Sequence, residues 1–177
     1  MSRYRLLYRR LRRAAAASAA ALLVVASSAA AQGLNYLNVA GTSFRPRDSA
    51  VNTNYGGAGC ISRGSGVTEF VYPVQLPHAS RIRFVRAYFY DTSAKDLTFR
   101  LFRHGGEGTG IEDATFTSNT SAGYTIRQSP ELDITVDNVS YATELSVLLA
   151  DASSSLELCG MRIAYIDDTI FENGFGD

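Results

Sequence analysis

The chain has no tryptophan, only two cysteines and only two histidines among its 177 residues. Two histidines and two cysteines do not form a cluster with the ligand spacing of structural zinc. Oxygen ligands for calcium are present at Asp167, Asp168, Glu172, Asn173 and Asp177, but without the spacing of a calcium loop, so a solvated acidic tail is the simpler interpretation. We expect no metal ion and no cofactor. The absence of tryptophan removes a residue that many sugar-binding platforms use. After the first 31 residues the sequence shows neither a long apolar run nor helical periodicity, so we expect no membrane span in the processed protein.

The first 31 residues have the order of a secretory signal peptide, which is basic, then apolar, then small. Six arginines and no acidic residue precede an alanine-rich run at 14–26, and the small residues 29–31 offer a cleavage site. Arg9 and Arg10 leave twin-arginine export as the alternative to ordinary secretion. The sequence therefore predicts a secreted protein in the periplasm, at the cell surface or outside the cell.

The rest of the chain is acidic. Six of the 17 basic residues lie in the leader and none of the 17 acidic ones does, so residues 32–177 carry a formal charge of −6. Such a domain has no general electrostatic attraction to nucleic acid or to an anionic membrane surface. We expect neither as a partner, and we expect one domain at 32–166 followed by a separate tail at 167–177.

The two cysteines predict one disulfide. Cys60 and Cys159 both follow the leader, and an even pair in an oxidising compartment is typical of a bridge. Its loop of close to 100 residues would stabilise the fold by about 4–5 kcal/mol in the chain-entropy model. It would tie an early segment to the last strand. The alternative is two separate buried thiols, and neither cysteine has a histidine nearby in sequence that would activate it as a nucleophile.

Short runs with alternating apolar and polar residues predict about eight to ten strands. The pattern indicates an all-β, two-layer antiparallel β-sandwich of the jelly-roll type. Pro73 marks an edge or an irregularity in its strand. The alternating apolar residues are Phe70, Tyr72, Val74 and Leu76; Leu97, Phe99 and Leu101; Leu132, Ile134 and Val136; Leu145, Val147 and Leu149; and Cys159, Met161, Ile163 and Tyr165.

The run at 81–90 changes phase. Ile82 and Phe84 alternate on one face, while Val85, Ala87 and Phe89 alternate on the other. A bulge near Phe84 and Val85 would bring both sets into the core. The outward face would then carry Arg86, Tyr88 and Tyr90.

Two polar segments are predicted connections. The segment DTSAKD at 91–96 is expected to close a hairpin. The glycine-rich segment HGGEGTG at 104–110 is interpreted as a link between strands, because no amphipathic helix follows that would turn its glycines into a phosphate site.

Arg86, Tyr88 and Tyr90 are the candidate ligand-binding or interface face. Tyrosine rings stack on sugar faces, and arginine adds hydrogen bonds and cation–π contacts. The same composition is typical of a packed subunit interface, so a homo-oligomer is the alternative. A single-stranded nucleic acid platform is also built this way, but the acidic charge and the compartment disfavour it.

No catalytic residue is predicted. His78 and His104 are interpreted as solvated loop histidines, and no serine stands in a nucleophile-elbow sequence. Glu69, Glu144 and Glu157 lie in predicted strands, where a glycosidase pair is conceivable. A solvated position or an arginine partner is the simpler interpretation.

The segment GTSFRPRDS at 41–49 predicts an internal ion-pair staple. The proline separates Arg45 from Arg47, and Asp48 is able to accept a hydrogen bond from either guanidinium. Recognition of an anion is the alternative.

Several segments together resemble a single-domain pattern of exported bacterial proteins whose function is uncharacterised. The resemblance implies an all-β domain with paired cysteines, corresponding to Cys60 and Cys159, and no activity. The ending DTIFENGF (168–175) resembles a short tail that recurs on secreted proteins of certain Gram-negative bacteria and implies sorting or surface attachment. The matching segments are GTSFRPRDS (41–49), GCI (59–61), YFYDTSA (88–94), SAGY (121–124), VDNVSY (136–141) and LCGMRIAY (158–165).

The sequence thus predicts a secreted or surface-associated, non-catalytic interaction module, adhesive or carbohydrate-binding, whose partner is a carbohydrate or a cell-surface component. The first alternative is a structural protein, a self-assembling jelly roll. A secreted hydrolase is the second.

Overall fold

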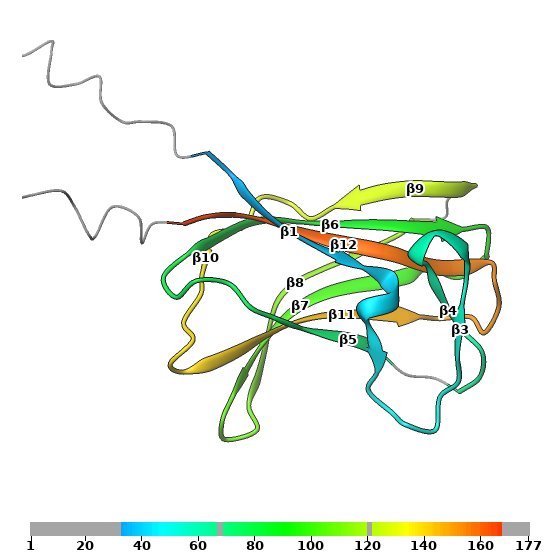
Figure 1. Cartoon of the computed structure of the whole chain (residues 1–177), viewed down its shortest axis with the longest axis horizontal. Coiled ribbons are helices and arrows are strands. Elements are labelled where there is room, and N and C mark those ends of the chain that lie inside the picture. The colour runs from blue at the N-terminus through cyan, green and yellow to red at the C-terminus, as the bar shows by residue number, and fades with distance from the viewer. Residues whose placement is uncertain (1–32, 67–68, 120–121, 168–177) are drawn as a thin grey trace, which may run out of the picture. The chain divides into compact units, whose positions relative to one another are not determined.

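The computed structural model describes residues 33–66, 69–119 and 122–167 (Figure 1). The predicted signal peptide and residues 168–177 of the predicted tail lie outside these ranges, so both stay predictions. Among the described residues, no helix has the length and apolar character that crossing a membrane requires.

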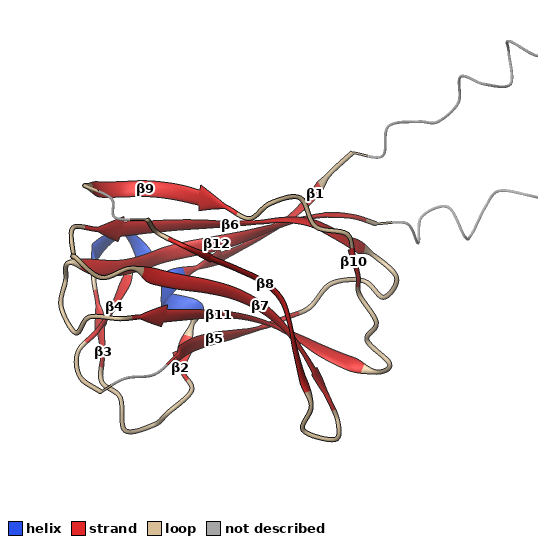
Figure 2. Cartoon of the chain, turned by 180° about the vertical axis from the view of Figure 1, so that it is seen from behind, coloured by secondary structure: helices blue, strands red, loops and turns tan. Residues whose placement is uncertain are grey.

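The alternating runs form strands that pair in two antiparallel sheets, one of seven strands and one of five. The prediction of a two-layer β-sandwich is confirmed, and Figure 2 shows the two layers from behind. Two three-residue 3-10 helices interrupt the early strands. The elements are β1 (Asn35–Ala40), η1 (Gly41–Ser43), β2 (Arg45–Pro46), β3 (Thr53–Tyr55), η2 (Gly57–Gly59), β4 (Ile61–Arg63), β5 (Glu69–Val74), β6 (Arg81–Asp91), β7 (Leu97–Gly105), β8 (Gly110–Thr117), β9 (Gly123–Gln128), β10 (Ile134–Thr135), β11 (Tyr141–Leu149) and β12 (Leu156–Ile166).

The larger sheet is built around β6 and β12, its two eleven-residue strands. β9 and β10 pair with successive parts of β6 along one edge, and β1 and β4 pair with successive parts of β12 along the other. β3 continues the sheet beyond β4. Two long central strands with short strands on both sides give this sheet a broad outer face.

The smaller sheet has the order β2-β5-β11-β7-β8. Its strand β5 contains Pro73, and the two residues of β2 pair only with Val71 and Phe70. Pro73 therefore lies beyond the end of β2, where the missing backbone N–H breaks no ladder bond on that side. The predicted edge position is confirmed at Pro73, and the pairing of β5 with β11 runs through this residue without a register shift.

The core lies between the sheets and consists of the inward residues of the alternating runs. Phe89 of the larger sheet and Phe99 of the smaller one are each 1% exposed or less, and their ring centroids are 5.2 Å apart. Phe116 of β8 extends this aromatic contact at 5.2 Å from Phe99. Burial of this apolar surface supplies the main stabilisation of the sandwich.

The expected hairpin at 91–96 is wrong. β6 and β7, which this segment joins, belong to different sheets. The polar residues of this segment are compatible with either connection, because a hairpin and a crossing between sheets both need solvated backbone at the bend. The glycine-rich segment at 104–110, in contrast, does connect two paired strands, with Gly105 N–H donating to the Thr109 carbonyl at 2.8 Å.

The phase change in β6 is a bulge, but it lies at Arg83. Ala164 is opposite Phe84 and Tyr165 is opposite Ile82, so Arg83 has no partner residue on β12. Ile82 thereby joins Val85 in the core. Phe84 stays half-buried on the outer face, which corrects the prediction that both sets enter the core.

A second bulge corrects the predicted inner face of the last strand. The register of β12 against β6 shifts between Leu158 and Gly160, which leaves Cys159 without a partner. Leu158 is fully buried and takes the core position expected for Cys159. The run at 132–136 also pairs less than expected, because only Ile134–Thr135 forms a strand, although Val136 is buried.

Candidate binding face

The outer face of the larger sheet collects aromatic and cationic side chains from four strands. After the bulge, the residues of β6 alternate between the two faces of the sheet. Ala87 and Phe89 are buried, and Arg86, Tyr88 and Tyr90 point outward. Residues opposite one another in an antiparallel pair share a face, so the register places neighbours from β9, β12 and β1 beside them. We call this set the tyrosine–arginine face; it comprises Tyr36, Asn38, Phe84, Arg86, Tyr88, Tyr90, Tyr124, Ile126, Gln128, Glu157 and Arg162.

The predicted residues Arg86, Tyr88 and Tyr90 all lie on this face. Sequence reasoning missed the contribution of Tyr124 and Ile126 from β9, which are 71% and 50% exposed. Nothing in local sequence connects them to β6, because the pairing of β9 with β6 is a tertiary fact.

One end of the face is aromatic. Tyr90 and Tyr124 are opposite one another, with ring centroids 4.8 Å apart. The next row holds Tyr88 beside Ile126 on one side and Gly160 on the other. Because Gly160 has no side chain, β12 places no side chain opposite Tyr88 on this face.

The other end of the face carries two arginines in register. Arg86 and Arg162 are opposite one another on β6 and β12. Arg86 donates from Nε and Nη2 to the Gln128 amide oxygen at 3.0 and 2.6 Å. The Arg162 guanidinium lies 4.7 Å from the centre of the Tyr36 ring, a cation–π distance. Among the described residues, neither arginine forms an ion pair.

A shallow cavity of about 210 Å³ lies at this cationic end. It is smaller than the roughly 300–1,000 Å³ of sites that enclose drug-sized ligands, so it accommodates one small group and not a whole oligosaccharide. Its lining is Leu34, Tyr36, Phe84, Arg86, Gln128, Arg162 and Ala164.

The outer face of the smaller sheet presents a paired charge network. Arg47 contacts Glu69 at 2.8 Å and Glu144 at 2.5 Å, and Arg100 also bonds to Glu69. His104 Nε2 lies 3.3 Å from the Glu144 carboxylate. The interpretation of Glu69 and Glu144 as arginine partners is confirmed.

Two predictions fail in this network. Asp48 does not pair with either neighbouring arginine but accepts a hydrogen bond from the Ala50 N–H at 2.8 Å. Arg47 instead pairs with Glu69 of β5 and Glu144 of β11, because folding places these two carboxylates beside its guanidinium. His104 lies within β7, not in a loop.

His78 follows the expectation of a solvated loop residue. It lies between β5 and β6, its side chain is 56% exposed, and its Nδ1 accepts the Asn138 N–H at 3.1 Å.

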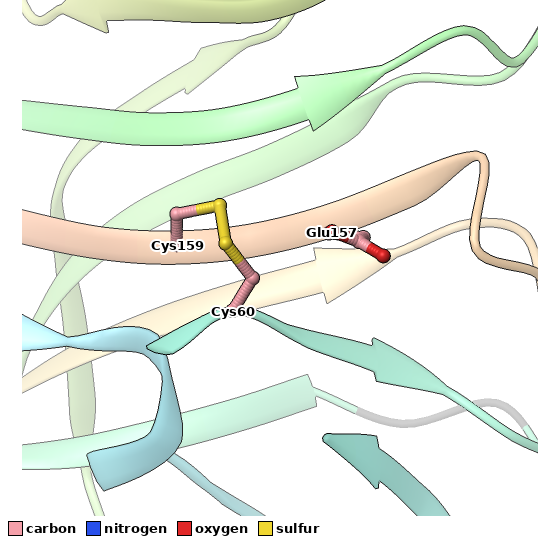
Figure 3. A group of neighbouring side chains, drawn as sticks. All are labelled: Cys60, Glu157 and Cys159. Atoms are coloured by element: carbon pink, nitrogen blue, oxygen red, sulfur yellow. A yellow bond between two sulfur atoms is a disulfide. The ribbon is translucent and has the colours of Figure 1, made fainter. Parts of the chain in front are cut away.

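The predicted disulfide is present. The Cys60 and Cys159 sulfurs are 2.01 Å apart, and the bond joins the residue before β4 to the last strand (Figure 3). Glu157 lies close to the two sulfurs, and in the described part of the chain these three residues are the one group with metal-ligand proximity. Because both sulfurs are bonded to each other, they do not offer thiolates, and the group does not fit a metal ion.

Comparison with known proteins supports the fold. No family model and no curated protein matches the chain. Among solved structures, the chain resembles the xylan-binding CBM22-1 domain of Xyn10C from Paenibacillus barcinonensis, with a TM-score of 0.52 and 15% identity over 79% of this chain and 100% of that domain. It also resembles the C-terminal CBM6 of the marine laminarinase LamC from Zobellia galactanivorans, with a TM-score of 0.51 and 15% identity over 73% of this chain and 98% of that one.

At this identity the similarity shows a shared sandwich fold. The all-β domain implied by the sequence resemblance is therefore confirmed, while the exported bacterial pattern itself stays a prediction.

Proposed function

We propose that this chain is a non-catalytic carbohydrate-binding module whose tyrosine–arginine face holds the sugar. The observation that carries the proposal is the row of tyrosines on the outer surface of the larger sheet. The ring centroids of Tyr90 and Tyr124 lie 4.8 Å apart, and Tyr88 is the preceding outward residue of β6. Aromatic rings pack against the apolar C–H faces of sugars.

The polar groups around these rings suit a hydroxylated ligand. Gln128 and Arg86 on one row, and Asn38 opposite Arg162 on β1, supply donors and acceptors at the rim of the aromatic surface. Aromatic rings surrounded by polar groups give a sugar both contact area and oriented hydrogen bonds.

Similar solved structures support the same function. The two domains named above carry the designation of carbohydrate-binding modules, and one of them is described as xylan-binding. The assignment of sugar binding to the tyrosine–arginine face goes beyond this fold-level similarity and rests on the side chains of the present chain.

The state of the acidic pair supports a role without catalysis. Glu69 and Glu144 are both engaged by the Arg47 guanidinium. A glycosidase instead keeps one carboxyl protonated as the general acid and the other available to the sugar or to water. The paired carboxylates are therefore better explained as structural.

The test is binding to soluble polysaccharides, measured by affinity gel electrophoresis over a panel of xylans, glucans, mannans and acidic polymers. Tyr88→Ala and Tyr90→Ala should each abolish or strongly reduce retardation, since aromatic contact provides most of the interaction area. Tyr55→Ala is the matched control, because Tyr55 is 70% exposed on β3 and lies outside this face. Retardation that survives both substitutions, or none with any polymer, would overturn the proposal.

Self-association is the alternative for the same face, because Tyr124 and Ile126 are exposed on β9. Sedimentation velocity separates the two functions. A monomer over a wide concentration range supports sugar binding, whereas a stable dimer or trimer that Ile126→Glu dissociates would show that the face joins copies of the chain.

A further inference from the structure

The cationic end of the tyrosine–arginine face has charge that no carboxylate among the described residues neutralises. Arg81 and Arg83, earlier on the same strand, pair with Asp133 and Glu131. Arg86, the next arginine along β6, donates to the neutral Gln128 amide and pairs with no carboxylate in the described part of the chain. Its position opposite Arg162 brings a second positive charge close by.

Arg162 has an unused donor. Its Nε is buried and has no hydrogen-bond partner among the described residues, while its guanidinium lies over the Tyr36 ring. A buried N–H without an acceptor costs free energy, and a charged donor costs more than a neutral one. An anion that binds the Nη groups of the same guanidinium would offset part of that cost by charge attraction.

The cavity between the two arginines favours an anion. Its other lining residues include the apolar side chains of Leu34, Phe84 and Ala164, and no carboxylate contributes to the lining. Apolar walls reduce solvent screening, so both the repulsion between the two guanidiniums and their attraction to an anion exceed the values in water. An anionic group bridging both arginines would bring opposite charge between two like charges.

We propose that this cavity receives the anionic group of an acidic sugar residue, a uronate carboxylate or a sugar sulfate. This inference rests on the proposed function and names its ligand class. Guanidinium groups bind such oxyanions with two parallel hydrogen bonds, which a neutral hydroxyl does not offer. The cavity volume of about 210 Å³ suits one substituent or one ring, and the remainder of the chain of sugars would lie along the tyrosines.

The spacing of the face agrees with a short oligosaccharide. Arg86, Tyr88 and Tyr90 are outward residues on one strand, so the first and last are about 13 Å apart along β6 at 3.3–3.4 Å per residue. The anionic group would be held at one end, and successive sugar rings would contact Tyr88 and then Tyr90 with Tyr124.

Isothermal titration calorimetry with matched ligands tests the inference. The probes are an oligogalacturonate, the same oligosaccharide as its methyl ester, and a sulfated galactan oligosaccharide. The ester keeps the ring and removes the charge. We expect the acid or the sulfated ligand to bind at least tenfold more tightly than the ester, and we expect its affinity to fall as salt rises. The ligand that binds identifies the anion as carboxylate or sulfate.

Two variants and one control locate the anion site. Arg86→Gln and Arg162→Gln should each bring the affinity for the anionic ligand down to about the level of the ester, and should lower the affinity for the ester far less. Arg45→Gln is the control, because Arg45 is an exposed arginine on β2 of the other sheet. Arg162→Lys keeps the positive charge and should retain part of the affinity that Arg162→Gln loses. Melting curves of both variants check that they are folded.

The outcomes separate the two proposals. Equal binding of the acid, the ester and the sulfated ligand that Tyr88→Ala abolishes would refute the anion site and leave the carbohydrate-binding function standing. Tight binding of the acid that neither arginine substitution affects would place the anion elsewhere and also refute it. No binding of any saccharide would refute both.

Discussion

Phe89 and Phe99 face each other across the sandwich with ring centroids 5.2 Å apart, although only the turn at 91–96 separates their strands along the chain. The strands β6 and β7 follow one another in the chain but do not pair. They belong to opposite sheets, and their inward aromatic residues meet in the middle of the core. This contact therefore forms where the two sheets pack against each other.

Truncating this contact should destabilise the fold. We expect Phe99→Ala to lower the free energy of unfolding by about 3–5 kcal/mol, because the site is fully buried and leaves a cavity. Urea denaturation followed by tyrosine fluorescence measures the change. Tyr124→Ala removes an exposed ring and should change stability by less than about 1 kcal/mol; equal effects of the two substitutions would contradict the placement of Phe99 in the core.

Removing the disulfide should also lower stability. Cys60→Ser with Cys159→Ser opens a loop with a sequence separation of 99, and we expect a loss of about 2–5 kcal/mol. Thermal melts with and without reductant measure it. Reductant should lower the melting temperature of the wild-type chain and leave the double variant unchanged, and thiol titration of the non-reduced wild type should find no free thiol.

The ion pair between Arg103 and Asp113 should contribute more than an ordinary surface pair. Arg103 donates from Nε and Nη2 to the two carboxylate oxygens at 2.5 and 2.6 Å, and the Asp113 side chain is 6% exposed. The hydrogen bond to Asp113 raises the pKa of Arg103 above its usual value. Asp113→Ala leaves a partly buried guanidinium without its partner and should cost about 1–3 kcal/mol. Asp113→Asn should cost less, since one acceptor remains; a larger loss with Asn than with Ala would contradict this account.

Acid should weaken the turn that precedes β11. Hydrogen bonds from the Ser140 side chain and from the backbone N–H groups of Val139 and Ser140 hold the pKa of Asp137 below its usual value of 3.8. Because the folded pKa is the lower one, the stabilisation is present above pH 3.8 and is lost as the pH falls through the folded pKa. We expect Asp137→Asn to reduce the drop in melting temperature between pH 6 and pH 2, and an unchanged drop would refute the role of this carboxylate.

Gly160 should resist replacement by alanine. A Cβ atom there would lie 2.7 Å from the Val39 carbonyl oxygen of the neighbouring strand β1, so backbone must shift. We expect Gly160→Ala to destabilise the fold by about 1–3 kcal/mol. Gly106 is the control, because a Cβ there meets nothing within 4 Å. Equal melting temperatures for the two variants would contradict the close approach of β1 to β12.

Alternation in the sequence was sufficient to predict the long strands and the two-layer architecture. The described residues form twelve strands where about eight to ten were expected, and four of the twelve have only two or three residues. Apolar residues at every second position of the runs at 97–101 and 145–149 are buried on one face, as a period of two requires. The number of cysteines and the expected compartment likewise predicted the disulfide. These features depend on local periodicity and on residue type.

Local patterns did not reveal which strands become neighbours. A polar turn is compatible with a hairpin or with a crossing between sheets, and the segment at 91–96 makes the crossing. The bulge position also depends on the partner strand, so Arg83 is the residue left out and Phe84 stays on the outer face. For the same reason, Arg47 pairs with two glutamates on strands distant in sequence and not with Asp48.

The candidate site likewise contains residues that the sequence predicted and residues that only the structure revealed. The sequence by itself determined that Arg86, Tyr88 and Tyr90 share one outward face, because alternation along a strand is a property of the chain. Only the tertiary structure decided that Tyr124 and Arg162 stand beside them, because strand pairing joins residues that are far apart in sequence through backbone hydrogen bonds that carry no side-chain signature.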